Sequence, residues 1–209
     1  SMRAMRLYGT FAAAFLLLAG SPAFAGTDIA SVVAATYGGF SLSPPTPAGV
    51  TYCHGFDCRF RKEVAFSPAD RARLARFMAR GRSSPKAERR AIGAAGAWFD
   101  RRAGAAAGTK GHVARANRDY MFDKGQLDCV DSSRNTTSLL LVLAQLKLLR
   151  HHDVVEPVAR GYLIDFRPPH VTAVLREHKT GVEWAVDSWT RAYGKAPEIM
   201  PLSRWKTLD

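Results

Sequence analysis

The sequence predicts an α+β protein in which helices come first, a buried helix follows, and an antiparallel sheet comes last. Three observations predict this order. Helix-start signals lie between residues 67 and 88, an apolar stretch covers residues 138–149, and segments rich in branched and aromatic residues follow residue 158. Because helical and strand patterns barely alternate, the order favours α+β over a doubly wound parallel sheet.

Composition indicates a folded chain with a strongly positive charge. Of its residues, 47% are hydrophobic and 23% are charged, which is typical of globular domains. A chain of 209 residues is also long enough to bury a hydrophobic core. The chain has 30 Lys and Arg residues against 18 Asp and Glu residues, a formal net charge of +12. Nucleic acid, anionic lipid headgroups and cell-wall polymers are therefore all candidate partners.

The first residues have the pattern of an export signal. Arg3 and Arg6 precede an apolar run over residues 11–19, and Ala23-Phe24-Ala25 follows as a small-x-small cleavage site. We therefore predict a signal peptide over residues 1–25 and a periplasmic or secreted mature protein. Export argues against nucleic acid as a partner, and no later stretch is long and apolar enough to span a membrane.

Two cysteines lie close together in residues 26–66, which we interpret as an N-terminal extension. Cys53 and Cys58 are separated by four residues, so a local disulfide is feasible in an oxidising compartment. The alternative is a metal site completed by His54 or His112, although the spacing matches no zinc pattern. A disulfide here leaves the third cysteine of the chain unpaired.

The remaining residues, 67–209, are expected to form the main domain. A serine followed by proline and an acidic residue predicts helices over residues 67–79 and 84–102. Residues 104–127 are small, polar and irregular, so a long loop is expected there. Residues 138–149 are apolar nearly all round, which predicts a helix in the middle of the core.

Strands are expected after this helix. Residues 158–164, 170–176 and 182–189 are rich in branched and aromatic side chains, and Thr180-Gly181 is a turn signal between the last two segments. We expect these segments to pair as antiparallel strands that pack on the buried helix.

Cys129 stands just before the buried helix and is the candidate nucleophile. A thiolate is favoured at a helix N-terminus beside an imidazole, which lowers the cysteine pKa. If Asp128 or Asp131 caps this helix, the sulfur lies where the backbone N–H groups converge, and these groups could also hold an oxyanion.

Hairpin geometry relates His170 to Asp187. A four-residue turn at 178–181 sets Asp187 opposite Thr172, so His170 and Asp187 share one face of the sheet as diagonal neighbours. A three-residue turn would put the two side chains on opposite faces. With the four-residue turn, an imidazole and an orienting carboxylate are available to a cysteine nucleophile.

Three segments carry a resemblance to a known family. Residues 127–131, Leu-Asp-Cys-Val-Asp, resemble the Gly-Asp-Cys-Glu-Asp element of bacterial transglutaminase-like cysteine peptidases. Residues 169–175 resemble the His-Ala-Val-Leu strand of that family, and residues 185–189 resemble the strand that bears the third triad member. The resemblance covers roughly residues 84–190 and implies a papain-like fold for the domain.

The resemblance also implies roles for three residues. Cys129 would be the nucleophile, His170 the general base and later acid, and Asp187 the residue that orients the imidazole. Enzymes of this family cleave amide bonds of proteins or peptides, or transfer their acyl groups, through a thioester. The implied function is thus an exported cysteine hydrolase or peptidase with a substrate in the cell envelope.

Departures from the family pattern affect the cofactor expectation. Some relatives bind calcium through acidic residues beside the cysteine, and Asp128 and Asp131 could contribute oxygens. Because Val130 stands where the family has glutamate, we expect no cofactor, and helix capping is the other role for both aspartates. Gln126 is the candidate side-chain oxyanion donor, although its spacing from Cys129 differs from that of papain-like enzymes.

A second function from another class fits the same sequence. The chain could keep the fold without the chemistry and use its positive surface to hold an anionic cell-wall polymer or lipopolysaccharide. Binding of this kind would weaken steeply with salt and would not depend on Cys129.

Overall fold

The computed structural model describes residues 28–161 and 169–208, so the predicted signal peptide lies outside the described residues. The elements are α1 (Ile29–Tyr37), η1 (Gly38–Phe40), β1 (Gly49–His54), β2 (Phe60–Ala65), α2 (Pro68–Ala79), α3 (Pro85–Ala107), η2 (Arg118–Tyr120), α4 (Cys129–Gln145), β3 (His152–Arg160), β4 (His170–Glu177), β5 (Glu183–Asp187), β6 (Glu198–Pro201) and α5 (Leu202–Trp205). Within the described ranges, no helix is long and apolar enough to cross a membrane.

The strands form two separate antiparallel sheets. β1 and β2 make a hairpin, while β3, β4, β5 and β6 form a four-stranded sheet in that order. Each strand of the larger sheet pairs antiparallel with its neighbour in sequence. The molecule is therefore α+β, as the order of sequence patterns predicts.

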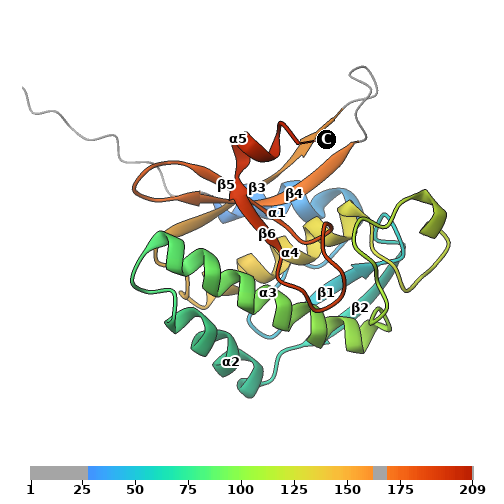
Figure 1. The fold of residues 1–209 in the computed structure, drawn as a ribbon. Helices are drawn as coiled ribbons and strands as arrows, with labels where there is room; N and C mark the ends of the chain where they lie inside the picture. Colours follow the sequence, from blue (N-terminus) through green and yellow to red (C-terminus); the bar gives the residue numbers. More distant parts are fainter. Residues whose placement is uncertain (1–27, 162–168, 209) are drawn as a thin grey trace, which may run out of the picture.

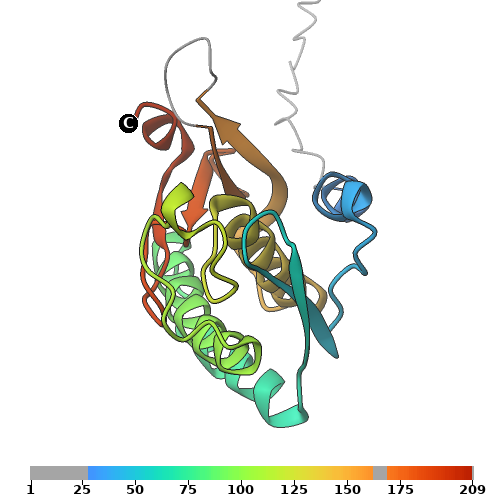
Figure 2. The same ribbon diagram turned by 90° about the vertical axis from the view of Figure 1, so that its right-hand side faces the viewer.

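Helix α4 is the centre of the molecule. It lies between the four-stranded sheet and α3 in Figure 1, and Figure 2 shows the β1–β2 hairpin on its other flank. Residues 139–143, in its apolar half, are almost fully buried and belong to the main hydrophobic core. The apolar stretch that predicted a central helix thus marks the C-terminal half of α4, which begins at Cys129 and ends at Gln145, short of residue 149.

The starts of α2 and α3 confirm the capping signals in the sequence. Ser67 and Asp70 form a capping box at α2, and the Ser84 side chain accepts from the N–H of Ala87 at α3. α3 continues to Ala107, so the expected loop at residue 104 was placed too early. Alanines have the highest helix propensity and extend α3 to Gly108, whose φ of +78° ends it.

Residues 28–66 are part of the main core. Val32 and Tyr37 from α1 and Val50 and Tyr52 from β1 are buried in the same hydrophobic cluster as α4. α1 and the β1–β2 hairpin were not predicted from the sequence. β1 is buried along nearly its whole length, so it lacks the alternation that marks a half-buried strand.

The β4–β5 hairpin has the predicted register. Ala173 pairs with Val186 and Arg176 with Glu183, and the N–H of Gly181 donates to the carbonyl of Glu177 to close a four-residue turn. This register sets Thr172 opposite Asp187. The neighbouring strands differ more from expectation, since β3 begins at His152 rather than at 158, and β6 was not predicted.

The two faces of the larger sheet are covered differently. Ala173, Leu175 and Val186 belong to the core that contains α4, whereas Val174 and Ala185 pack with Trp205 of α5. Figure 1 shows α5 on the side of the sheet away from α4. Since side chains alternate along a strand, His170 and Asp187 lie on the α5 face.

Candidate active site

Cys129 is the first residue of α4, and two aspartates cap the helix around it. The Asp128 side chain accepts from the N–H of Asp131 at 2.8 Å, and the Asp131 side chain accepts from the N–H of Asp128 at 3.3 Å. This reciprocal capping box satisfies two N–H groups of the helix end. The expectation that Asp128 or Asp131 caps the helix is therefore confirmed.

The disulfide loop packs against the same helix start. Cys53 and Cys58 form a disulfide with a Cα–Cα distance of 4.6 Å, as predicted, and Cys129 is the free cysteine. The N–H groups of Phe56 and Cys58 donate to Asp131 at 2.8 and 2.7 Å. The N–H of the intervening residue, Asp57, donates to the Asp128 carboxylate at 2.9 Å.

These contacts decide whether the residues considered as metal ligands in the sequence, Asp128 and Asp131 for calcium and the two cysteines for another metal, are free to bind one. Every carboxylate oxygen of Asp128 and Asp131 accepts a backbone N–H, so the four oxygens face hydrogen-bond donors and do not fit a calcium site. The sulfurs of Cys53 and Cys58 lie close to an Asp131 oxygen, but their disulfide leaves no thiolate to bind a metal. The donor set of this region therefore fits no metal ion.

The two histidines of the metal alternative are engaged elsewhere. The His54 ring contacts the carbonyl of Lys124 at 2.6 Å, and His112 contacts the Asp100 carboxylate at 3.0 Å. Neither histidine joins Cys53 and Cys58 in a ligand cluster among the described residues.

His170 and Asp187 form a buried pair. Nε2 of His170 lies 2.6 Å from Oδ2 of Asp187, and the two side chains are only 5% and 3% exposed. Because an ionised carboxylate can only accept, this contact fixes the proton of a neutral ring on Nε2. Nδ1 of His170 is buried and has no hydrogen-bond partner within residues 28–161 and 169–208, so its lone pair is available to take up a proton.

Two tryptophans enclose this pair and were not found by sequence reasoning. The ring centroids of Trp189 and Trp205 lie 4.6 and 5.3 Å from that of His170. Nε1 of Trp205 also donates to Oδ2 of Asp187 at 2.8 Å, so this oxygen accepts two hydrogen bonds. Trp189 follows Asp187 by two residues and could have been noticed from the sequence, but no local signal connects Trp205 to the pair.

The sulfur of Cys129 lies beside the first residues of β4. The backbone N–H groups of Val171 and of Cys129 itself point at the sulfur, which brings it to the residue next to His170. No hydrogen bond joins the thiol to the ring of His170 among the described contacts. The structure thus brings Cys129 to the strand that bears His170, and it brings His170 and Asp187 into direct contact.

The electrostatic surroundings keep Cys129 protonated at rest. Burial raises the pKa of the Cys129 thiol to about 11, and the charges of Asp128 and Asp187 add to this. The N–H groups of Val171 and Cys129 act in the opposite direction but do not outweigh burial. The sequence predicted a lowered pKa at this helix end. The difference arises because the sulfur is mostly buried and carboxylates stand near it.

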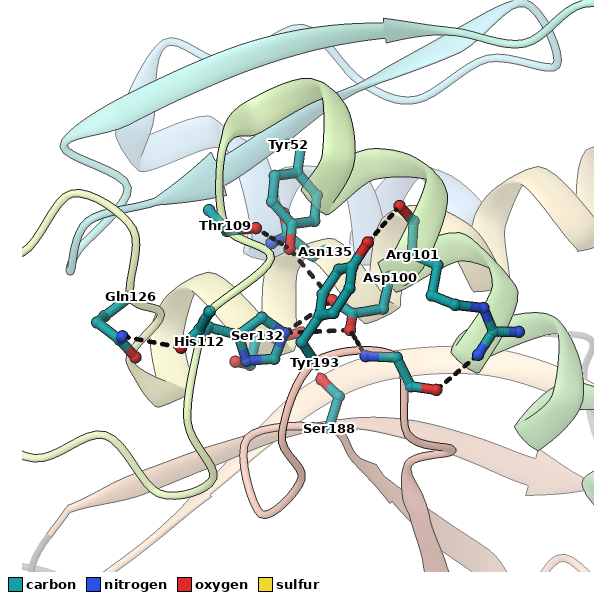
Figure 3. A network of polar contacts seen from close by, with 12 residues as sticks. Tyr52, Asp100, Arg101, Thr109, His112, Gln126, Ser132, Asn135, Ser188 and Tyr193 are labelled. Atoms are coloured by element: carbon teal, nitrogen blue, oxygen red, sulfur yellow. Dashed lines mark hydrogen bonds and ion pairs between the residues drawn. The ribbon is translucent and has the colours of Figure 1, made fainter.

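The amide of Gln126, the candidate oxyanion donor, binds the loop after α3. Its Oε1 accepts from the N–H of Val113 at 2.9 Å, and its Nε2 donates to the carbonyl of Gly111 at 3.2 Å (Figure 3). Both ends of the amide therefore hold this loop in place. An oxyanion role for Gln126 stays a prediction.

Figure 3 also shows a second histidine–carboxylate pair, which sequence reasoning did not find. Asp100 of α3 contacts His112, and it also accepts from the hydroxyl of Tyr52 and the N–H of Gly194. The adjoining cavity has a volume of about 30 Å³, which is room for only one or two water molecules. These three contacts of Asp100 join α3 to strand β1 and to the loops that contain His112 and Gly194.

Comparison with known proteins finds no match: neither the protein-family models nor the curated proteins nor the solved structures contain one for this chain.

Proposed function

We propose that this chain is a cysteine hydrolase or acyltransferase of transglutaminase-like type that acts on amide bonds of proteins or peptides. The observation that carries the proposal is the orientation of His170. Asp187 holds Nε2 of the ring, while the unpartnered Nδ1 lies in a buried site on the strand that the Cys129 sulfur contacts. A general base for a thiol nucleophile needs a ring nitrogen that is free to take a proton, and Nδ1 of His170 meets this requirement.

In the first half of the proposed reaction, Nδ1 of His170 takes the thiol proton as the sulfur of Cys129 attacks the carbonyl carbon of the amide. The carbonyl oxygen becomes an oxyanion, and the backbone N–H of Cys129 at the start of α4 is a donor for it. Asp187 stabilises the imidazolium. His170 then gives its proton to the leaving nitrogen, the C–N bond breaks, and a thioester on Cys129 remains.

In the second half, water or an amine attacks the thioester and His170 takes the proton of the attacking group. The C–S bond breaks, and the proton returns to the sulfur. Water as the attacking group gives hydrolysis, and an amine gives transfer of the acyl group. Because the resting thiol is protonated, proton transfer accompanies the attack on the substrate and no stable ion pair precedes it.

A covalent probe whose reaction needs both Cys129 and His170 tests this proposal. Vinyl sulfones gain a proton as the thiol adds to them, so a working cysteine–histidine pair reacts with them far faster than an isolated thiol. We expect blocked dipeptidyl vinyl sulfones to label Cys129 of the full chain at pH 7, as located by mass spectrometry. The His170→Ala change should slow this labelling by about 100-fold or more.

The buried His112 provides a matched control. It also contacts an aspartate, so His112→Ala removes a second buried imidazole without touching the candidate nucleophile. Labelling that persists in His112→Ala and disappears in His170→Ala supports the proposal. Equal labelling of the wild-type protein and His170→Ala, or no labelling of the wild-type protein, would disprove it.

We also propose that the protein acts in an oxidising compartment, the periplasm or the cell exterior. The Cys53–Cys58 disulfide supports this location, because disulfides persist mainly outside the cytosol. The expected export signal is in keeping with the same location.

One observation favours the alternative of a binding protein. A groove of about 790 Å³ lies between α3 and the β5–β6 end of the sheet. Lys86, Arg89 and Arg90 line it beside apolar residues such as Trp184 and Ile199, and none of the described residues that line it is acidic. Such a groove could hold an anionic cell-wall polymer. Binding there should weaken steeply with salt and survive Cys129→Ala.

A further inference from the structure

A second pocket adjoins the candidate nucleophile on the α4 face of the sheet. It has a volume of about 190 Å³ and is enclosed by the end of α1, the first turns of α4 and strands β3 and β4. Val130, the residue after Cys129, and Val171, the residue after His170, both form part of its wall. Through these two wall residues the pocket lies one position along the chain from Cys129 and from His170, which are themselves not part of its wall.

One cation lines the pocket, and its position is fixed. Arg134 of α4 is only 8% exposed, its Nε donates to the carbonyl of Thr36 at 3.2 Å, and its guanidinium carbon lies 3.2 Å from the ring centroid of Phe40. Stacking and one hydrogen bond thus hold the guanidinium in a single orientation, which lowers the entropic cost of binding a ligand.

Two buried polar atoms of residues that line this pocket have no hydrogen-bond partner among the described residues. They are Nη1 of Arg134 and Oγ1 of Thr36, whose residues come from different helices. Buried polar atoms in native proteins nearly always have a hydrogen-bond partner, so two orphans in one pocket indicate a group that is bound there in use. Both atoms can donate a hydrogen bond, and the ligand group must therefore accept.

Because Arg134 is positively charged, the ligand group that accepts these hydrogen bonds should be an anion. Burial lowers the pKa of Arg134, while the charges of Asp57, Asp131 and Asp128 oppose this shift. Asp128 and Asp131 use their oxygens on backbone N–H groups, and Arg134 forms no ion pair with any residue that the structure describes. A buried guanidinium without a carboxylate partner is stabilised by a carboxylate that arrives with the ligand.

We propose that Arg134 and Thr36 form a specificity pocket for an acidic side chain of the polypeptide substrate, close to the amide that Cys129 attacks. This inference rests on the proposed function. The carboxylate of an aspartate or glutamate accepts from Nη1 of Arg134 and from the hydroxyl of Thr36. The volume of about 190 Å³ equals that of roughly six water molecules, which suits one side chain and is smaller than the usual site for a whole small-molecule ligand.

Peptide binding to the full chain with Cys129→Ala tests the pocket without requiring catalysis. The probes are fluorescein-labelled blocked hexapeptides of alanine with one glutamate moved through the six positions, each paired with its glutamine counterpart. Fluorescence anisotropy should show, at one position, binding that is about 10- to 100-fold tighter for glutamate than for glutamine. Arg134→Gln should reduce this ratio to less than about threefold.

Three further variants separate recognition from folding and from overall charge. Thr36→Val keeps the shape of the residue and removes its hydroxyl, so it should lower the ratio several-fold. Arg134→Lys keeps the charge without the fork of N–H donors and should retain part of the ratio. Arg71→Gln removes one positive charge from the distant helix α2, where Arg71 holds the carbonyl of Phe66, and should leave the ratio unchanged.

The outcomes distinguish the two proposals. If glutamate has no advantage at any position, or if its advantage survives in Arg134→Gln and Thr36→Val, the pocket holds water only and the inference is wrong. If Arg134→Gln does not fold, Thr36→Val and Arg134→Lys decide the question. Selective binding without amide cleavage by the wild-type protein would overturn the catalytic proposal alone, while cleavage without acidic preference would overturn the pocket alone.

Discussion

At the scale of single residues, the free thiol and its neighbours have opposite proton preferences. Burial and two nearby carboxylates keep the proton on Cys129, whereas the hydrogen bond from Nε2 to Asp187 leaves Nδ1 of His170 ready to accept one. If Cys129 is the nucleophile that we propose, it stays unreactive in this state until a substrate aligns the two groups.

This resting state predicts a distinctive pH dependence for a reagent that needs only the thiolate. With a pKa of about 11, the rate of alkylation of Cys129 by iodoacetamide should rise about tenfold per pH unit from pH 7 to 10. In the chain unfolded in urea, the rate should level off near the ordinary thiol pKa of about 8.5. Mass spectrometry of quenched samples gives both rates. A plateau below pH 8 in the folded protein would show a preformed thiolate instead.

The sequence alone predicted part of the candidate site. Cys129, His170 and Asp187 could be proposed together because a helix start and a hairpin register are local features that spacing reveals. The contacts of Trp205 and Arg134 could not be predicted, since they depend on where α5 and α1 pack in three dimensions. Arg134 follows Cys129 by five residues on α4, and nothing in its neighbours indicates that it stacks on Phe40.

At the scale of elements, the disulfide loop supports the start of α4. Residues 55–58 all have positive φ, between +52° and +76°, which is unusual for the three that are not glycine. In this conformation the N–H groups of the three non-glycine residues donate to the two capping aspartates. The disulfide and these hydrogen bonds therefore maintain each other.

Replacing both cysteines of the loop should loosen the helix start as well as lower stability. Cys53→Ser with Cys58→Ser should reduce the free energy of unfolding by about 2 kcal/mol, because the closed loop is short. Hydrogen exchange at residues 129–132 should quicken in this variant, while exchange at the centre of α4 should change only with overall stability. Unchanged exchange at the helix start would show that the capping aspartates suffice without the loop.

The elements also show what sequence patterns capture. The N-caps of α2, α3 and α4 could be predicted from the sequence because serine, proline and aspartate favour a helix start through local hydrogen bonds. The β1–β2 hairpin was missed because its loop uses three non-glycine residues with positive φ, which no turn rule anticipates. That conformation is imposed by Asp128 and Asp131, more than seventy residues away in the chain.

At the scale of the whole molecule, two buried carboxyl groups make stability depend on pH in opposite ways. Although burial raises the pKa of Glu88, hydrogen bonds from His152 and from the N–H groups of Arg150 and His151 outweigh it, and the net pKa is lowered. For Asp131, burial and the charge of Asp128 outweigh three N–H donors and raise the pKa to about 7.

These shifts predict a stability maximum in mildly acidic solution. The contribution of Glu88 is present above its ordinary pKa of 4.5 and is lost as the pH falls through its lower folded value. The contribution of Asp131 is complete below its ordinary pKa of 3.8 and is lost as the pH rises to about 7. The free energy of unfolding should thus peak near pH 4 and fall by roughly 3 kcal/mol between pH 5 and 8.

Urea unfolding at several pH values measures this curve. Asp131→Asn removes the titrating group, so the decline between pH 5 and 8 should flatten in that variant, although its stability at pH 5 should be lower. A wild-type curve that rises over this interval would contradict the raised pKa of Asp131.

The short spacing of Cys53 and Cys58 also decides which two of the three thiols pair when the unfolded chain meets an oxidant. The entropic cost of closing a loop grows with the number of residues in it, and Cys53 is five residues from Cys58 whereas Cys129 is 71 residues away. Cys53 and Cys58 are therefore expected to pair with each other faster than either pairs with Cys129. Once they have paired, no other cysteine of the chain is left for Cys129, and the candidate nucleophile stays free of an internal disulfide.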